Sequence, residues 1–148
     1  MTTRPALRFA FAVALTAGAA LPAAALEPFN AQYQASYMGM QANANMTLAR
    51  EGNAHWKYSL QIRNQVADLR QNTVFEEHEG QLRPLSSNDQ SVMLIRRKSV
   101  TANYDWKTAQ ASWSGDVKDD RRGPIKLQAG DMDALLMNLA VTRDAQAG

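Results

Sequence analysis

Strict alternation of apolar and polar residues marks the stretch from Met40 to Ile62. Apolar side chains occupy every second position before a short turn at 51–54, and the same period continues after it. The alternating apolar set is Met40, Ala42, Ala44, Met46, Leu48, Trp56, Tyr58, Leu60 and Ile62. A period of two places these side chains on one face of a β-sheet. The pattern therefore predicts an antiparallel hairpin, with Gly52 and Asn53 tolerating the positive φ that its turn requires.

Further strand patterns extend this predicted sheet on both sides of the hairpin. Strands are expected over 29–38, 72–78, 82–90, 92–104 and 109–113, and the 92–104 segment is long enough for one bent strand or two shorter ones. Pro84 lacks a backbone N–H, so it is expected at a sheet edge or at the start of a strand. The segment 64–71 is interpreted as a loop or a short helical turn.

A helical pattern occurs near the C-terminus, over 131–143, after a polar loop at 114–130. Its apolar stripe is Met132, Leu135, Leu136, Leu139 and Val141. Asp131 or Asp133 can accept hydrogen bonds from the free amides of the first helical turn. The prediction for the whole chain is a mainly β domain: a curved antiparallel β-meander of about six to eight strands, with one C-terminal helix packed on the sheet.

The first 25 residues resemble an export signal rather than part of the domain. Arg4 and Arg8 precede an uncharged apolar run at 9–20, and small residues lead up to Ala25. We expect cleavage after Ala25, which leaves 26–148 as a single domain in the periplasm or outside the cell. The alternative is an N-terminal membrane anchor, but the apolar run is short for a membrane span. No transmembrane segment is expected in the mature chain.

Charge and cysteine content exclude several function classes. Removing Arg4 and Arg8 from the 16 basic residues leaves 14, which balance the 14 acidic residues. A neutral mature chain argues for neither a nucleic-acid partner nor an acidic membrane surface. The sequence contains no cysteine, which excludes disulfides, a thiolate nucleophile and a cysteine-based metal site.

No catalytic or metal-binding constellation emerges from the polar residues. The densest cluster is 76–79, but strand alternation places Glu76 and His78 on one face and the other two glutamates on the opposite face. Two ligands on each face are too few for a metal site. No serine lies in a nucleophile elbow, and the chain has no glycine-rich phosphate loop. We therefore predict a non-enzymatic protein without a metal or cofactor.

The run Arg96-Arg97-Lys98 is the only basic cluster in the sequence. Alternation along a strand sends Arg96 and Lys98 to one face and Arg97 to the other, so these residues do not form one patch. Charges at this position discourage edge-to-edge pairing of strands. Contact with lipid phosphates or an anionic polysaccharide is the alternative interpretation.

Methionine and aromatic residues provide the candidate binding surface. Met40, Met46, Trp56 and Tyr58 share one predicted sheet face, to which Trp106 and Trp113 are possible additions. Such side chains adapt to irregular apolar ligands, so this face is a candidate site for an acyl chain. The alternative is an ordinary core, in which the C-terminal helix simply covers the same residues.

Short motifs spread along the chain resemble those of the DUF3108 family of exported bacterial proteins. They are Pro28-Phe29, Tyr33, Gly39, Phe75, Gly80, Arg83-Pro84, Tyr104-Asp105-Trp106, Asp133-Ala134-Leu135, Leu139 and Gly148. Asn43 and Leu136 depart from the family pattern. The family is uncharacterised, so the resemblance implies an envelope address and an antiparallel sheet, but no activity. Because members typically continue with more strands, this chain is expected to be a C-terminally truncated fragment.

The function predicted from these observations is non-catalytic binding of a lipid or another apolar or amphiphilic ligand in the cell envelope. Two alternatives remain open at this point. One is a structural or partner-binding module that uses an unpaired sheet edge to bind another envelope protein. The other is an enzyme whose site lies in missing C-terminal strands.

Overall fold

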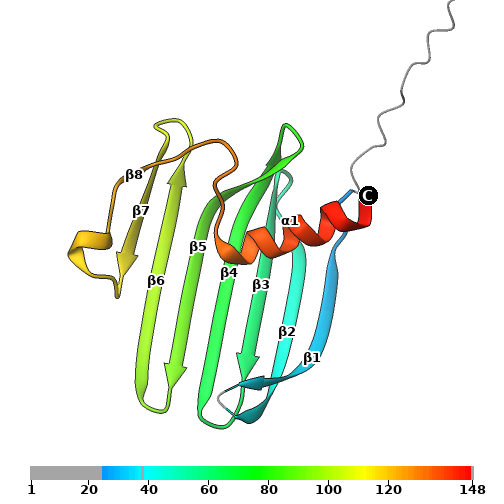
Figure 1. Ribbon diagram of the computed structural model, residues 1–148, viewed down its shortest axis with the longest axis vertical. Helices are drawn as coiled ribbons and strands as arrows, with labels where there is room; N and C mark the ends of the chain where they lie inside the picture. The colour runs from blue at the N-terminus through cyan, green and yellow to red at the C-terminus, as the bar shows by residue number, and fades with distance from the viewer. Residues whose placement is uncertain (1–24, 38, 148) are drawn as a thin grey trace, which may run out of the picture.

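A computed structural model of the protein describes residues 25–37 and 39–147. Eight antiparallel strands form one open, curved sheet in which each strand pairs with its neighbours in the sequence (Figure 1). The strands are β1 Phe29–Tyr37, β2 Met40–Glu51, β3 His55–Arg63, β4 Ala67–His78, β5 Gln81–Met93, β6 Arg96–Asp105, β7 Gln110–Gly115 and β8 Ile125–Lys126. A 3-10 turn at Asp119–Arg121 precedes β8, and the helix α1 spans Ala134–Ala147. The predicted fold class is confirmed.

The central hairpin has the predicted register. Leu48 on β2 lies opposite Tyr58 on β3, and Gly52 in the turn adopts a φ of 70°. Trp56 is 2% exposed on the face that carries α1, which we call the helix face. Lys57 belongs to the opposite, outer face and is half-buried there. The prediction that alternate residues separate an apolar face from a polar one is therefore confirmed.

The prediction of a loop or helical turn over 64–71 is wrong for most of that segment. β4 already begins at Ala67, and Leu69 lies opposite Ile62 of β3. On the outer face, Asp68 accepts hydrogen bonds from Arg70 and from Gln61 of β3. Pairing with β3 therefore stabilises as a strand a stretch whose own apolar pattern is weak.

The 92–104 segment divides into two strands, which was one of its two predicted forms. β5 ends at Met93 and β6 begins at Arg96, after an exposed turn in which Leu94 has a φ of 54°. Pro84 lies near the start of β5, where a register shift opposite Val74 and Phe75 interrupts the pairing with β4. A proline without an N–H is tolerated at such an irregular position.

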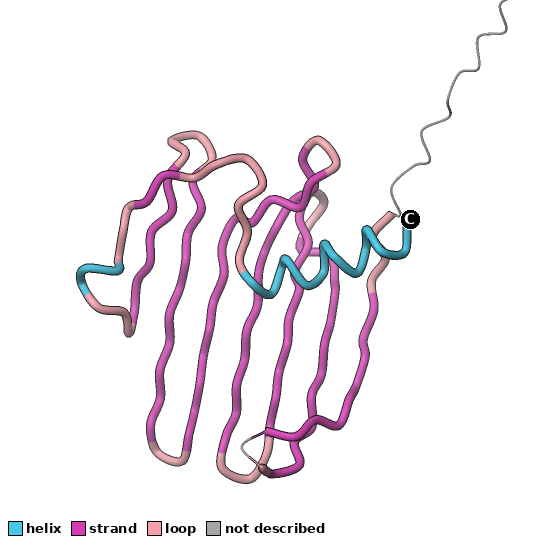
Figure 2. The backbone as a smooth tube through the Cα atoms, in the orientation of Figure 1, coloured by secondary structure: helices cyan, strands magenta, loops and turns pink. Residues whose placement is uncertain are grey.

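The helix packs across one end of the helix face and does not reach the other end, where β1 turns across the sheet (Figure 2). Its contacts define the core, which comprises Leu48, Trp56, Tyr58, Phe75, Leu82, Leu136 and Leu139. The helix begins three residues later than predicted, at Ala134. Val141 is 64% exposed, so its predicted place in the buried stripe is wrong.

Hydrogen bonds at both ends fix the position of α1 on the sheet. Asp133 Oδ1 accepts from the backbone N–H of Leu136 at 2.8 Å, which caps the helix. Asp133 Oδ2 also accepts from the Thr73 hydroxyl of β4 at 2.9 Å. Near the C-terminal end, the buried Arg143 donates from Nη2 to the carbonyl of Gly80 at 3.1 Å. These contacts set which part of the sheet the helix covers.

The predicted signal peptide, 1–25, lies outside the described residues except for Ala25. Within the part of the chain that the structure describes, no helix combines the length and the apolar character needed to cross a membrane.

Candidate functional site

An open hollow of about 460 Å³ lies on the helix face, beside the core residues that α1 covers. Its lining residues are Leu60, Ile62, Leu69, Gln71, Asp89, Gln90, Ser91, Lys98 and Val100. They come from β3, β4, β5 and β6, which are consecutive strands of the sheet. The site is therefore built by cross-strand register rather than by a loop or a local sequence motif.

The two sides of this open hollow differ in chemistry. On one side, Ile62 of β3 lies opposite Leu69 of β4. Leu60, two residues before Ile62, lies on the same face of β3. On the other side, Ser91 of β5 lies opposite Lys98 of β6, and Asp89 lies opposite Val100. The hollow thus presents the apolar side chains of Leu60, Ile62 and Leu69, with the polar Gln71 opposite Leu60, next to a border that carries one ammonium and one carboxylate.

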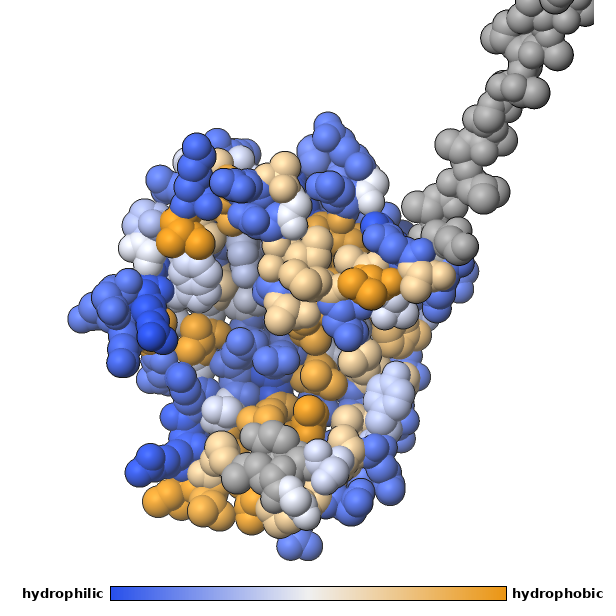
Figure 3. Space-filling view, in the orientation of Figure 1, coloured by the Kyte–Doolittle hydropathy of each residue, from blue (hydrophilic) through white to orange (hydrophobic). Residues whose placement is uncertain are grey.

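A polar band lies beside the open hollow on β4, β5 and β6, next to the core beneath α1. The helix face carries Thr73, Ser87, Asp89 and Tyr104 in this region, with Asp133 of the helix cap hydrogen-bonded to Thr73. In Figure 3, hydrophilic residues occupy the middle of this face, and hydrophobic residues lie on both sides of them. On β3 there is no such band, because Tyr58 of the core and Leu60 of the open hollow follow each other on the same face.

Two groups in the polar band have altered acidity. Partial burial raises the pKa of Asp89, and the nearby Asp133 carboxylate raises that pKa further. Burial also raises the pKa of Tyr104, again with a contribution from Asp133. In both cases partial burial disfavours the charged form, and the Asp133 carboxylate adds repulsion between like charges.

Replacing Asp89 with asparagine is expected to raise the melting temperature near pH 7. The pKa of Asp89 is higher in the folded protein than in the unfolded chain. As pH rises from the unfolded pKa to the folded pKa, the unfolded chain therefore loses this proton more readily, and the free energy of unfolding falls. The gain should disappear below about pH 3, where Asp89 is protonated in both states. Thermal unfolding of wild type and variant at both pH values tests this expectation.

Asp105 provides a control of opposite sign for that experiment. Backbone and side-chain hydrogen bonds from Thr108 lower the pKa of Asp105, so ionisation of this carboxyl stabilises the fold. Asp105→Asn should therefore lower the melting temperature at neutral pH. The same direction of change for both variants at neutral pH would contradict the raised pKa of Asp89.

The four residues of the predicted apolar ligand face lie in different surroundings. Trp56 and Tyr58 are 2% and 1% exposed in the core under α1, and Met46 packs against that core. Met40 is 38% exposed and lines a separate hollow of about 730 Å³, together with Ala42 and Arg63 among others. The structure thus brings together Met46, Trp56 and Tyr58 and leaves Met40 apart.

Sequence reasoning did not assign the residues of the open hollow. Leu60 and Ile62 belong to the alternating set, so the sheet face on which they lie was predicted. The sequence did not predict that α1 would cover Trp56 and Tyr58 but not these two residues. Leu69 lay in a segment interpreted as a loop or helical turn. Val100 and Lys98 join them only through the pairing of four strands, which no local signal in the sequence reveals.

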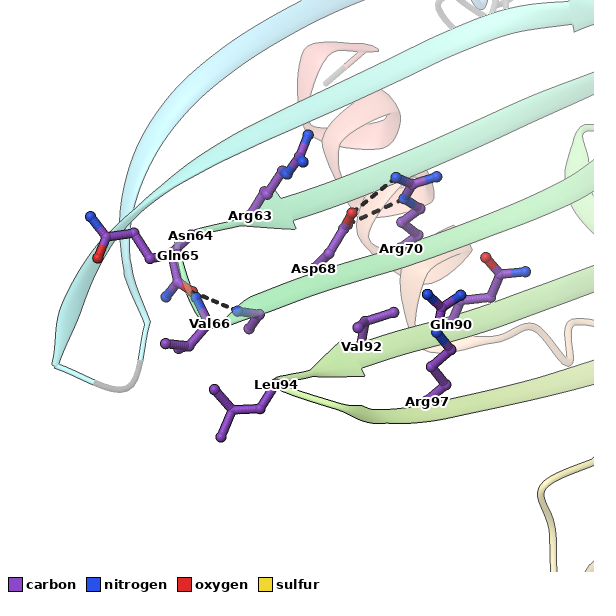
Figure 4. A pocket seen from close by; sticks show the side chains of 11 residues that line it. Arg63, Asn64, Gln65, Val66, Asp68, Arg70, Gln90, Val92, Leu94 and Arg97 are labelled. Atoms are coloured by element: carbon purple, nitrogen blue, oxygen red, sulfur yellow. Dashed lines mark hydrogen bonds and ion pairs between the residues drawn. The ribbon is translucent and has the colours of Figure 1, made fainter.

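The basic run divides between the two faces as predicted. Lys98 lines the open hollow on the helix face, whereas Arg97 lines a hollow of about 430 Å³ on the outer face, shown in Figure 4. In that outer hollow Arg70 forms an ion pair with Asp68 at 2.9 Å, and Arg63 lies nearby. Arg63, Arg70 and Arg97 therefore line the same outer hollow as the carboxylate of Asp68.

Within the acidic cluster at 76–79, Glu76 forms an ion pair with Arg83 and lies near His55. Glu76 Oε1 accepts from Arg83 Nε at 2.8 Å, and its other oxygen lies 3.9 Å from His55 Nε2. Among the residues that the structure describes, no group of three or more histidine, cysteine, aspartate or glutamate side chains is placed to hold a metal ion.

Comparison of the chain with protein-family models, with curated proteins and with solved structures finds no match. The resemblance to the DUF3108 family stays a prediction.

Proposed function

We propose that the protein binds an amphiphile in the open hollow, with the apolar chain of the ligand against β3 and β4 and an anionic head group near Lys98. The observation that carries this proposal is the apolar surface of Leu60, Ile62 and Leu69, which α1 does not cover. An exported protein would meet such ligands in the cell envelope, and the predicted signal peptide supports this location.

The energetic argument rests on the uncovered apolar side chains. Completing the burial of one large aliphatic side chain is worth up to roughly 1.5–3 kcal/mol, and Leu60, Ile62 and Leu69 are each only half-buried. A hydrocarbon chain laid over them would remove this surface from water. The polar border beside Val100 would keep the charged end of the ligand in contact with water and with the ammonium of Lys98.

Binding of dodecanoate and dodecanol, measured by isothermal titration calorimetry, tests the proposal. The two probes share one hydrocarbon chain and differ in the head group. Both are expected to bind the wild-type protein, because the apolar chain supplies most of the affinity. Lys98→Gln should weaken dodecanoate binding about fivefold, because one lysine near an anionic group contributes about 1 kcal/mol, and should leave dodecanol binding unchanged.

Arg97 provides the matched control for this experiment. It adjoins Lys98 in the sequence and carries the same charge, but it lies on the outer face of the sheet. Arg97→Gln should leave the affinity for both probes unchanged. Absence of binding by either probe to the wild-type protein would refute the proposed function, and equal losses in the two variants would refute the place assigned to the head group.

A further inference from the structure

The outer edge of β1 lacks the features that usually protect an edge strand. β1 is the first strand in the sheet order, so within the described residues it pairs on one side only, with β2. Its sequence, Phe-Asn-Ala-Gln-Tyr-Gln-Ala-Ser-Tyr, contains no charged residue, no proline and no glycine. Its register with β2 runs without a bulge from Phe29 to Tyr37. Such an edge is a ready template for pairing with another strand.

The opposite edge of the sheet is covered by the chain itself. Gln110 and Ala111 of β7 pair with the short strand β8. The backbone N–H of Trp113 donates to the carbonyl of Arg122 at 2.8 Å. The N–H of Leu127 donates to the carbonyl of Ala109, also at 2.8 Å. The two edges therefore differ, because the segment after β7 occupies the backbone groups of one edge and none of the described residues does the same for β1.

The sequence of β1 reads nearly the same in both directions from Tyr33. In an antiparallel pairing of two copies about Tyr33, Ala31 would lie opposite Ala35, Gln32 opposite Gln34, Asn30 opposite Ser36, Phe29 opposite Tyr37, and Tyr33 opposite itself. A two-fold axis requires a surface that is complementary to itself. Between Ala31 and Ala35, every residue of β1 would then face a residue of the same type, which is the arrangement that favourable cross-strand pairs need.

We propose that two copies of this chain associate through their β1 edges, in antiparallel register about Tyr33. Tyr33 is 50% exposed on the helix face, and association would bury part of that ring against its counterpart. Gln32 and Gln34 are exposed on the outer face, where their amides can hydrogen-bond across the new pair. Because β1 turns across the sheet near its C-terminal end (Figure 1), residues 31–35 form the centre of the ladder.

This association joins the two sheets into one and places both open hollows on the same side of it. The proposal does not depend on the function of those hollows. The occupant of the edge is identified as a second copy by the symmetry of the β1 sequence, since a different partner would not require that symmetry.

Charge variants at Gln32 and Gln34 test the register itself. In the proposed dimer each Gln32 faces Gln34 of the other copy, so Gln32→Lys/Gln34→Lys places lysine opposite lysine twice. Gln32→Glu/Gln34→Glu places like charges opposite one another in the same way. Each variant is expected to raise the dimer dissociation constant by roughly tenfold or more, because like charges across an interface are strongly unfavourable. Sedimentation velocity of the full chain, expressed with its own N-terminal segment, measures the change over a dilution series.

Complementary combinations should restore association. An equimolar mixture of the Lys/Lys and Glu/Glu variants should dimerise, and Gln32→Lys/Gln34→Glu should dimerise by itself.

Asn103→Lys/Ser114→Lys is the control, because it adds the same charge as the Lys/Lys variant at exposed outer-face positions of β6 and β7 and should leave the dimer intact. Circular dichroism checks that each variant is folded. A monomeric wild-type chain, an unaffected Lys/Lys variant or a mixture that stays monomeric would overturn the proposal.

Discussion

Replacing Phe75 with alanine is expected to lower the free energy of unfolding by about 3–5 kcal/mol, which is the usual cost of deleting a fully buried phenylalanine ring. The Phe75 side chain is completely buried, and it belongs to the cluster that joins β4 to Leu136 and Leu139 of α1. Its removal leaves a cavity under the helix as well as the loss of apolar burial. Chemical denaturation of the variant, followed by tryptophan fluorescence and circular dichroism, measures the loss.

Phe29 allows the same substitution to be made outside the core. It lies on the same face but on the edge strand β1, where it is 38% exposed and meets Tyr58 edge to face at 6.2 Å between ring centroids. Phe29→Ala should cost about 1 kcal/mol, since only part of its surface is removed from water. A comparable loss in the two variants would mean that the region beneath α1 is not the principal core of the protein.

Introducing a carboxylate into the open hollow is expected to weaken dodecanoate and dodecanol binding by roughly tenfold to a hundredfold. Ile62→Asp removes an aliphatic contact worth about 1 kcal/mol for a side chain that is already half-buried, and it places a charge where the hydrocarbon chain should lie, which adds the larger part of the loss. Ile62 is half-buried at the wall of the hollow, opposite Leu69. The loss should be similar for both probes, unlike the effect of Lys98→Gln, because it concerns the chain that the probes share.

The adjacent residue gives the matched control for this variant. Arg63 is exposed and belongs to the outer face of β3, so Arg63→Asp introduces the same side chain one position away. Arg63→Asp lowers the net charge by two units, whereas Ile62→Asp lowers it by one. If the added negative charge weakened dodecanoate binding through long-range repulsion, the control would therefore show the larger effect. Retained binding in Arg63→Asp together with lost binding in Ile62→Asp is the expected result. The reverse outcome would place the ligand on the outer face.

Placement of the helix explains why a predicted apolar face became two different surfaces. The alternation from Met40 to Ile62 predicted which side chains share a face, but it contains no information on how far along the strands the helix reaches. The contacts that set this limit join Thr73 to Asp133 and Gly80 to Arg143, which lie 60 and 63 residues apart in the sequence. Trp56 therefore lies in the core, while Ile62 on the same strand faces the open hollow.

By itself, the sequence determined most of the strands and their faces, because a period of two is a local property that each strand carries in its own residues. The short strand β8 was not among them, because it lies in the segment 114–130 that was predicted as a loop. Local patterns of this kind predicted the hairpin of β2 and β3 and the separation of Arg97 from Lys98. They also predicted a cap of the helix by Asp131 or Asp133, of which the structure uses Asp133. Only the tertiary structure decided the start of β4 at Ala67 and the composition of the open hollow. Both depend on cross-strand register and helix docking, whose energies come from residues far apart along the chain and leave no periodic signal within any one segment.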